Sequence, residues 1–182
     1  MIYNFNGPVQ EYPESILSLD GEKIDNVKTF KYLGSQVQYN QPTTGDTEIT
    51  CRIDMAESKF YEHGKKLMNF KIHLSTRVSI LNSLVRSRLT YGSQTWTLTQ
   101  AQKTRLDAAY LSMLRKMIRG GYARKEDSWS FKMTNAEILE RCQTCAITEF
   151  TEGLKRSYLA HVIRLPNTSI AKQIAFNANN VG

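Results

Sequence analysis

The sequence predicts a mainly α-helical protein, in which short N-terminal β-strands precede a helical bundle and further C-terminal helices. Short apolar runs broken by turn residues fill the first 45 positions, and from Thr47 onward apolar residues recur every three or four positions. No apolar run approaches the ~18 residues that a membrane-spanning helix requires. With 182 residues, 41% of them hydrophobic, the chain can bury a sizeable core without disulfides or metal.

The N-terminal region predicts short β-strands, the first of them in a hairpin. Ile16–Leu19 leads into Asp20-Gly21, a strong hairpin turn signal, and Glu22–Ile24 supplies the returning strand. Thr29–Val37 is rich in β-branched and aromatic residues, as strands are, and contains Gly34. So few short strands are not expected to form a free-standing domain.

Two long helices are predicted next. The first begins at Asp46 or Thr47 as N-cap and presents one apolar stripe, made by Ile49, Ile53, Ala56, Phe60, Leu67 and Ile72. The second starts after Ser75 and runs to about Tyr91-Gly92. Its apolar stripe is wide, which indicates burial on more than one side: Val78, Ile80, Leu81, Leu84, Val85 and Leu89.

Four further helices follow from local signals. Thr99 is an N-cap for a helix that Gly120-Gly121 ends. A polar linker is expected over Arg124–Lys132, and Thr134 with Glu137 forms a capping box for the next helix. The last two helices are expected over Ala146–Ile163 and Ser169–Phe176.

The positive charge is concentrated in the middle of the chain. The net charge is +7, made of −4 in residues 1–50, +11 in residues 51–125 and 0 in residues 126–182. A concentrated positive field attracts polyanions, of which nucleic acid is the common one. The alternative is a surface that serves only solubility.

The residues of common catalytic and metal sites are missing or scattered. The sequence has no Asp-Asp pair, no G-x-S-x-G, no P-loop and no H-E-x-x-H. Its three histidines are isolated. Cys142 and Cys145 could bind zinc only with distant partners such as Cys51 and His161, and their spacing also suits the packed face of a helix. We therefore expect no catalytic residues, no metal site and no cofactor in this chain.

The compartment follows from the cysteines and from the first residues. Three cysteines are an odd number at low density, which favours a reducing intracellular compartment, the nucleus or the cytoplasm. Met1–Gln10 has neither a charged start nor an apolar stretch, so no secretory signal is expected.

A row of cations is the best candidate binding site. Arg52, Lys59 and Lys66 are seven positions apart, so they follow one flank of the first helix. With Arg77 and Arg88 on the second helix, they could bind a phosphate backbone. Cations at the edge of a core also occur simply because their stems pack there. Aromatic residues near helix ends could stack on bases or pack in the core: Tyr91, Trp96, Tyr122 and Trp129.

Four motifs, in order and at matching spacing, resemble reverse transcriptases of non-LTR (LINE-type) retrotransposons. Phe30–Ser35 is similar to their F-x-Y-L-G-S segment, and Leu89–Trp96 to their L-x-Y-G-x-E-x-W. Leu114–Gly120 resembles L-R-x-I-x-G, and His161–Pro166 resembles G-H-V-x-R-x-P. The resemblance covers nearly the whole chain.

The resemblance implies three regions and one further site. Residues 1–45 would be the last part of the polymerase palm, residues 46–122 a helical thumb, and residues 123–182 a helical connector with a polar tail. Tyr32, Leu33 and Gly34 would be the primer grip. Gln94 and Ala160 depart from the family pattern, which has Glu and Gly there.

The resemblance also implies what this chain could do. Such enzymes are RNA-directed DNA polymerases that hold Mg²⁺ on palm aspartates, including those of a Y-x-D-D turn, and no such turn occurs in these 182 residues. We expect a polymerase fragment without activity by itself that keeps contact with RNA, RNA–DNA hybrid or DNA template–primer, and no contact with membrane. The alternative is a non-catalytic helical module that binds nucleic acid or protein.

Overall fold

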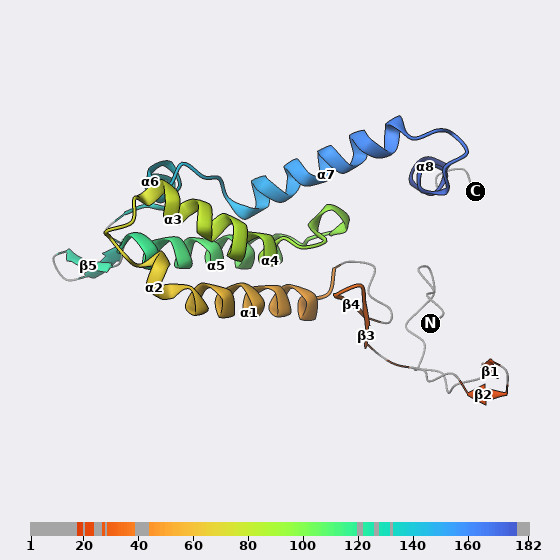
Figure 1. Cartoon of the computed structure of the whole chain (residues 1–182), viewed down its shortest axis with the longest axis horizontal. Helices are drawn as coiled ribbons and strands as arrows, with labels where there is room; N and C mark the ends of the chain where they lie inside the picture. The colour runs from red at the N-terminus through yellow and green to blue at the C-terminus, as the bar shows by residue number, and fades with distance from the viewer. Residues whose placement is uncertain are drawn as a thin grey trace.

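The architecture is mainly helical, with short antiparallel hairpins near the N-terminus, as the sequence predicts (Figure 1). In the computed structural model, helices α1, α3–α4, α5 and α7 lie roughly lengthwise in layers, with α1 and α7 on opposite sides of α3–α4 and α5. The structure describes residues 18–19, 21–23, 27, 29–38, 44–119, 122–125, 128–131 and 133–177.

The predicted N-terminal strands form, and they pair as two hairpins. Strand β1 (Ser18–Leu19) pairs with β2 (Glu22–Lys23) around Gly21, while Asp20 and Ile24 lie outside the described residues. Strand β3 (Thr29–Tyr32) pairs with β4 (Ser35–Gln38), with Tyr32 opposite Ser35. The turn between β3 and β4 is therefore only two residues long.

The first predicted helix is shorter than expected. Helix α1 (Asp46–Glu62) begins after Gly45 at the N-cap position, so Asp46 is its first residue and not its cap. Helix α2 (Gly64–Leu67) follows a break at His63, where the prediction ran on to Ile72. Glycine is a poor helix former, and Gly64 is packed so closely that an added Cβ would lie 3.2 Å from the Met68 Cε.

The second predicted helix is continuous but irregular. It consists of α3 (Leu74–Leu81), the π-helical turn η1 (Asn82–Arg86) and α4 (Ser87–Leu89). His73 is its N-cap, not Ser75, because the His73 side chain accepts a bond from the Ser75 backbone N–H. The helix ends at Leu89, before the turn that leads to the short 3₁₀ helix η2 (Ser93–Thr95).

Local capping signals correctly predict the starts of two helices. Thr99 and Gln102 form a reciprocal capping box at the start of α5 (Gln100–Ile118). Thr134 and Glu137 do the same for α6 (Asn135–Arg141). Helix α5 ends at Arg119, which adopts φ = 54°, while Gly120 and Gly121 lie outside the described residues.

The expected polar linker over Arg124–Lys132 is wrong in part. Strand β5 (Tyr122–Lys125) pairs there with β6 (Ser128–Phe131) as a third antiparallel hairpin. The segment contains aromatic residues at alternate positions, Trp129 and Phe131, and this pattern favours a strand. Here it outweighs the polar composition that predicted a linker. Helices α7 (Ile147–Arg164) and α8 (Ile170–Asn177) then form within a residue of the expected bounds.

One hydrophobic core is shared by α1 to α5, α6 and the start of α7. Helix α1 packs on η1, α4 and α5, and α5 packs on α6 and α7. Phe60, Leu81, Tyr110 and Ile147 are fully buried in this core. The Tyr110 hydroxyl donates to Asn82 Oδ1 over 2.9 Å, and burial raises the pKa of Tyr110.

Arg77 lies inside this bundle and joins three of its segments. Its Nη1 donates to the carbonyls of Leu67 and Met117 over 3.2 and 2.8 Å, and its Nε donates to the carbonyl of Ile72 over 3.1 Å. Its side chain also lies over the Phe70 ring, and the residue is only 5% exposed. One guanidinium therefore satisfies carbonyls of α2, the loop before α3 and α5.

Within the described residues, no helix has both the length and the apolar content needed to cross a membrane.

Replacing Arg77 should destabilise the bundle. Arg77→Met leaves three backbone carbonyls without their charged donor, so we expect the free energy of unfolding to fall by about 2–4 kcal/mol. Arg88→Met, a matched change at an exposed arginine, should change it by less than about 0.5 kcal/mol. Urea unfolding measures both, and equal effects would contradict the structural role of Arg77.

Candidate nucleic-acid interface

The turn between β3 and β4 is tight and places a leucine in a left-handed backbone conformation. Leu33 and Gly34 both have positive φ, 48° and 85°, as the central residues of a tight two-residue hairpin turn do. Glycine adopts such angles freely, but leucine does so at a cost. A hairpin of two four-residue strands is also marginal by itself in water.

Two side chains from the helical bundle bind the carbonyls of this turn. The Tyr91 hydroxyl donates to the Leu33 carbonyl over 3.0 Å, and Arg52 Nη2 donates to the Gly34 carbonyl over 2.6 Å. On the returning strand, the Gln36 backbone N–H donates to Glu48 Oε2 over 2.6 Å. The hairpin is thus fixed to α1 and to the turn after α4.

Arg52 and Glu48 form a buried ion pair beneath the hairpin. Arg52 Nε lies 2.7 Å from Glu48 Oε1, and the two residues are 4% and 3% exposed. The Arg52 guanidinium also lies over the Tyr91 ring, 4.6 Å from its centroid. Because Arg52 is only 4% exposed and its guanidinium is bound by Glu48 and the Gly34 carbonyl, it serves the hairpin and is not on the surface that phosphates could reach.

Gly92 allows the hairpin to approach the turn after α4. It adopts φ = 74°, and an added Cβ would lie 3.4 Å from Ser35 Oγ. Tyr91 therefore donates to the hairpin turn, and Gly92, which has no side chain, leaves room for Ser35 of the hairpin.

The hairpin presents its tip to solvent. Tyr32 is 62% exposed and Leu33 is 75% exposed, although the backbone between them is tightly held. Of the residues expected to form a primer grip, Tyr32 and Leu33 are therefore accessible, and Gly34 lies between Tyr91 and Arg52.

The predicted row of cations divides into buried and exposed members. Arg52 and Arg77 are buried in intramolecular bonds, so we leave both out of the candidate surface. Lys66 and Arg88 are exposed and Lys59 is partly exposed. These three residues, on α1, α2 and α4, remain.

Lys59 and His63 both pair with the Glu62 carboxylate, on which the charge of Arg88 also acts. Lys59 Nζ lies 2.6 Å from Glu62 Oε2, and His63 Nε2 lies 3.7 Å from the other Glu62 oxygen. The hydrogen bond from Lys59, with the charges of Lys59, His63 and Arg88, lowers the pKa of Glu62. The seam between α1 and α4 thus holds more positive than negative charge.

The surrounding sequence supplies little counter-charge. Between His63 and Lys125 the only acidic residue is Asp107. Its carboxylate accepts from the backbone N–H and the hydroxyl of Thr148, over 3.0 and 2.7 Å, at the start of α7. That carboxylate therefore positions α7 and is not directed at the cations of α2 and α4.

The aromatic candidates also separate. Trp96 is buried in the core, whereas Tyr91 is 50% exposed. The side chains of Tyr122 and Trp129 lie outside the described residues.

No group of three metal-ligating side chains exists within the part of the chain that the structure describes. Cys142 is buried, which raises the pKa of its thiol, and it packs in the hydrophobic core. The two cysteines do not share the packed face of a helix, as their spacing suggested, because Cys142 is the C-cap of α6 and Cys145 lies in the loop before α7.

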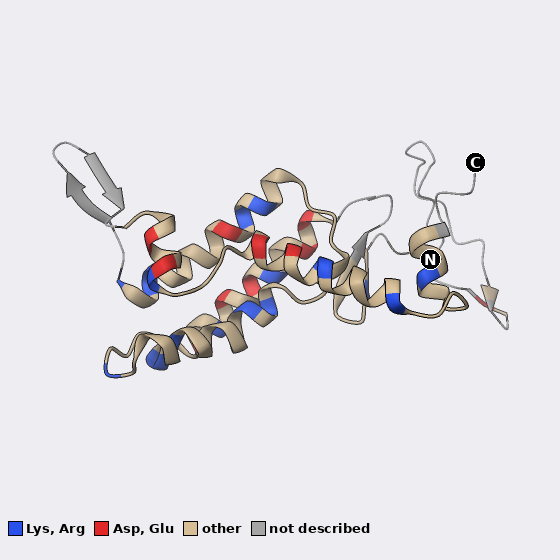
Figure 2. Cartoon of the chain, turned by 90° about the horizontal axis from the view of Figure 1, so that it is seen from above, with Lys and Arg blue, Asp and Glu red and all other residues tan. Residues whose placement is uncertain are grey.

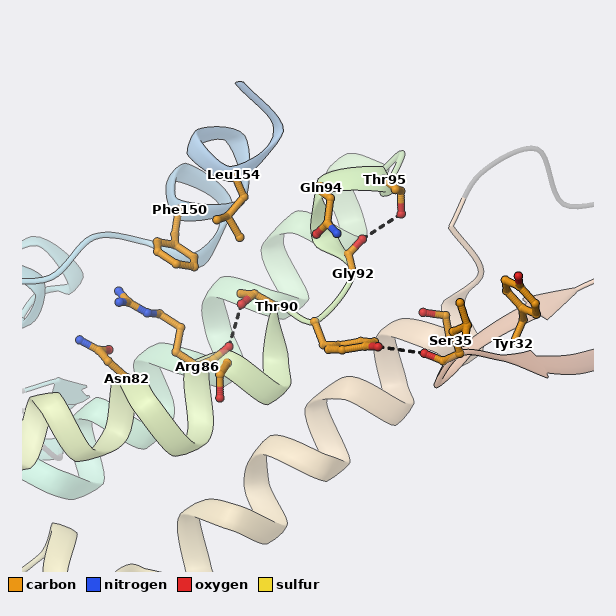
Figure 3. A pocket seen from close by; sticks show the side chains of 13 residues that line it. Tyr32, Ser35, Asn82, Arg86, Thr90, Gly92, Gln94, Thr95, Phe150 and Leu154 are labelled. Carbon is orange, nitrogen blue, oxygen red and sulfur yellow. Dashed lines mark hydrogen bonds between the residues drawn. The ribbon is translucent and has the colours of Figure 1, made fainter. Parts of the chain in front are cut away.

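A groove of about 710 Å³ lies between the hairpin, the turn after α4 and α7, and sequence reasoning missed it (Figure 3). Its lining combines side chains from three segments far apart in the sequence, residues 32–35, 82–95 and 150–154, the second of which includes the π-helical turn η1. No periodicity in the sequence marks such a place. The motif around Tyr91-Gly92 was the one available signal.

No known protein family, curated protein or solved structure matches this chain.

Breaking the Glu48–Arg52 pair should release the hairpin. Arg52→Met leaves the Glu48 carboxylate buried without its cation, so we expect a loss of about 3–5 kcal/mol in the free energy of unfolding. Glu48→Met plus Arg52→Met should recover part of this loss, because no charge then stays buried alone.

Urea unfolding measures the cycle, and hydrogen exchange at the Gln36 amide, which donates to Glu48, reports on the hairpin. Strictly additive losses of unfolding free energy, or slow exchange at Gln36 in both variants, would contradict the claim that the Glu48–Arg52 pair holds the hairpin.

Proposed function

We propose that this chain contributes template–primer contact to a reverse transcriptase of the LINE type, binding RNA–DNA hybrid or duplex through phosphates. The observation that supports this most is a locked, exposed hairpin tip at one end of a row of accessible cations. The tip is Tyr32-Leu33, and the row is Arg88, Lys59 and Lys66.

The order of these groups along the seam supports a backbone-tracking surface. Arg52 and Lys59 are seven residues apart on α1, which places Lys59 about 10 Å further along the same face than the hairpin contact. Arg88 belongs to α4, and its charge contributes to the lowered pKa of Glu62, the carboxylate that pairs with Lys59. Lys66 continues the row in α2.

Phosphate contacts of this kind give affinity with little sequence preference, because base edges are not read. Lysine and arginine side chains that bind phosphates release counterions, so the affinity falls as salt rises. Within the described residues no side-chain cluster suits two-metal catalysis. The proposed role is binding of the nucleic acid.

Binding through the seam should depend on salt and on three cations. With labelled RNA–DNA hybrid, log K should fall with log salt at a slope of about −3 to −5. Lys59→Gln, Lys66→Gln and Arg88→Gln together should make the slope shallower by about two to three units and weaken all sequences alike.

The matched control removes the same charge from α7, through Lys155→Gln, Arg156→Gln and Arg164→Gln. Glu62→Gln is expected to act in the opposite direction and tighten binding, because it frees Lys59 from the carboxylate at 2.6 Å. The proposed surface would be contradicted if the triple variant of the seam and the triple variant of α7 lost the same binding affinity. It would also be contradicted if the chain did not bind hybrid at low salt.

A second candidate function is protein docking. The outer half of α7 and all of α8 expose large apolar side chains, and no acidic residue follows Glu152 (Figure 2). The exposed apolar residues are Tyr158, Leu159, Ile163, Ile170, Ile174 and Phe176. Exposed apolar patches of this kind mark interaction sites. Under this alternative the seam variants would not change hybrid binding beyond the effect of their net charge.

A further inference from the structure

The groove beside the hairpin shares Tyr32 and Leu33 with the proposed phosphate-tracking surface but none of its three cations, and its lining has a distinct chemistry. Asn82 and Arg86 from η1 form one end, and Phe150 and Leu154 of α7 lie across from them (Figure 3). Tyr32 and Ser35 of the hairpin form the other end. Its volume of about 710 Å³ is in the range of small-molecule and cofactor sites.

One end of the groove is suited to an anion. The Arg86 guanidinium lies under the Phe150 ring, 4.1 Å from its centroid, and is half-buried. Its one hydrogen bond among the described residues is a long one, from Nη1 to Thr144 Oγ1 over 3.5 Å. Among the residues that the structure describes, no aspartate or glutamate lines the groove. A partly desolvated arginine with free donors and no carboxylate nearby is a binding group for phosphate.

The helix is irregular at this end of the groove. Asn82 and Arg86 are the first and last residues of the π-helical turn η1, inside an otherwise α-helical segment. Single π-helical turns frequently occur at functional sites. Asn82 is held in place because its Oδ1 accepts from the buried Tyr110 hydroxyl.

The other end of the groove offers an aromatic face. Arg52 covers one face of the Tyr91 ring, and the ring is half exposed and lines the groove. The open face is therefore the one opposite Arg52. Tyr32 and the exposed Gln94 amide also line this end, so a base could stack on Tyr91 with a hydrogen-bonding side chain beside it.

We infer that this groove binds one or two unpaired nucleotides at the end of a nucleic-acid strand. The phosphate binds Arg86 and the base stacks on the open face of Tyr91. The inference rests on the proposed function for the source of the strand, since a hybrid on the seam would present its unpaired end beside the hairpin. The groove itself requires only a nucleotide.

The first test uses a trinucleotide that contains 2-aminopurine, whose fluorescence is quenched when the base stacks. We expect saturable quenching by the wild-type chain. Arg86→Gln and Tyr91→Leu should each weaken it at least about tenfold, whereas Arg86→Lys should lose less than Arg86→Gln.

Tyr91→Phe is the matched control, because phenylalanine keeps the stacking face and loses only the hydroxyl bond to Leu33. Quenching should therefore survive in Tyr91→Phe. Thermal unfolding by circular dichroism confirms that each variant is folded. No quenching by the wild type, or equal quenching in folded Arg86→Gln and Tyr91→Leu, would overturn the inference.

The second test compares hybrids with blunt ends and hybrids with two unpaired nucleotides. The overhang should tighten binding several-fold in the wild type but not in Arg86→Gln. The triple variant of Lys59, Lys66 and Arg88 should weaken binding of both hybrids alike. Quenching of the trinucleotide without hybrid binding would sink the proposed function and leave the groove standing. Hybrid binding that is equally tight with and without the overhang would overturn the groove inference and leave the proposed function standing.

Discussion

The interaction on which the rest of the candidate interface depends is the Arg52 guanidinium beneath the β3–β4 hairpin. One side chain pairs with Glu48, donates to the Gly34 carbonyl and lies over the Tyr91 ring. A hairpin of this size has little stability alone, and its turn holds Leu33 at a positive φ. The strain in the turn and the burial of the charge are both compensated by the same set of contacts. As a result the exposed tip has one defined position relative to the seam of cations.

The sequence could not show which of the predicted cations are buried and which are accessible. Arg52 and Arg77 are buried, whereas Lys59, Lys66 and Arg88 are at least partly exposed. A spacing of seven places residues on one helix flank, but it does not say whether a hairpin or another helix covers that flank. Arginine is also the cation that tolerates burial, since its planar fork can satisfy several carbonyls at once, as Arg77 does.

The parts of the fold that depend on local chemistry were predictable. The N-cap signal of Thr99 and the capping box at Thr134 correctly placed two helix starts, and the Asp20-Gly21 turn signal placed the first hairpin. The parts that depend on tertiary packing were not. The break at His63, the π-helical turn at Asn82–Arg86 and the groove across from Phe150 arise from contacts between distant segments, and hydrophobic periodicity carries no record of them.

Photo-crosslinking tests the central claim most directly, that the hairpin tip and the cation seam contact nucleic acid together. An RNA–DNA hybrid with 4-thiothymidine at successive positions would be bound at low salt, irradiated and mapped by mass spectrometry. The account predicts crosslinks at Tyr32 or Leu33 from one end of the hybrid, and crosslinks in α1, α2 or α4 from positions further along. Crosslinks confined to the outer half of α7 and to α8, or spread evenly over the chain, would contradict it.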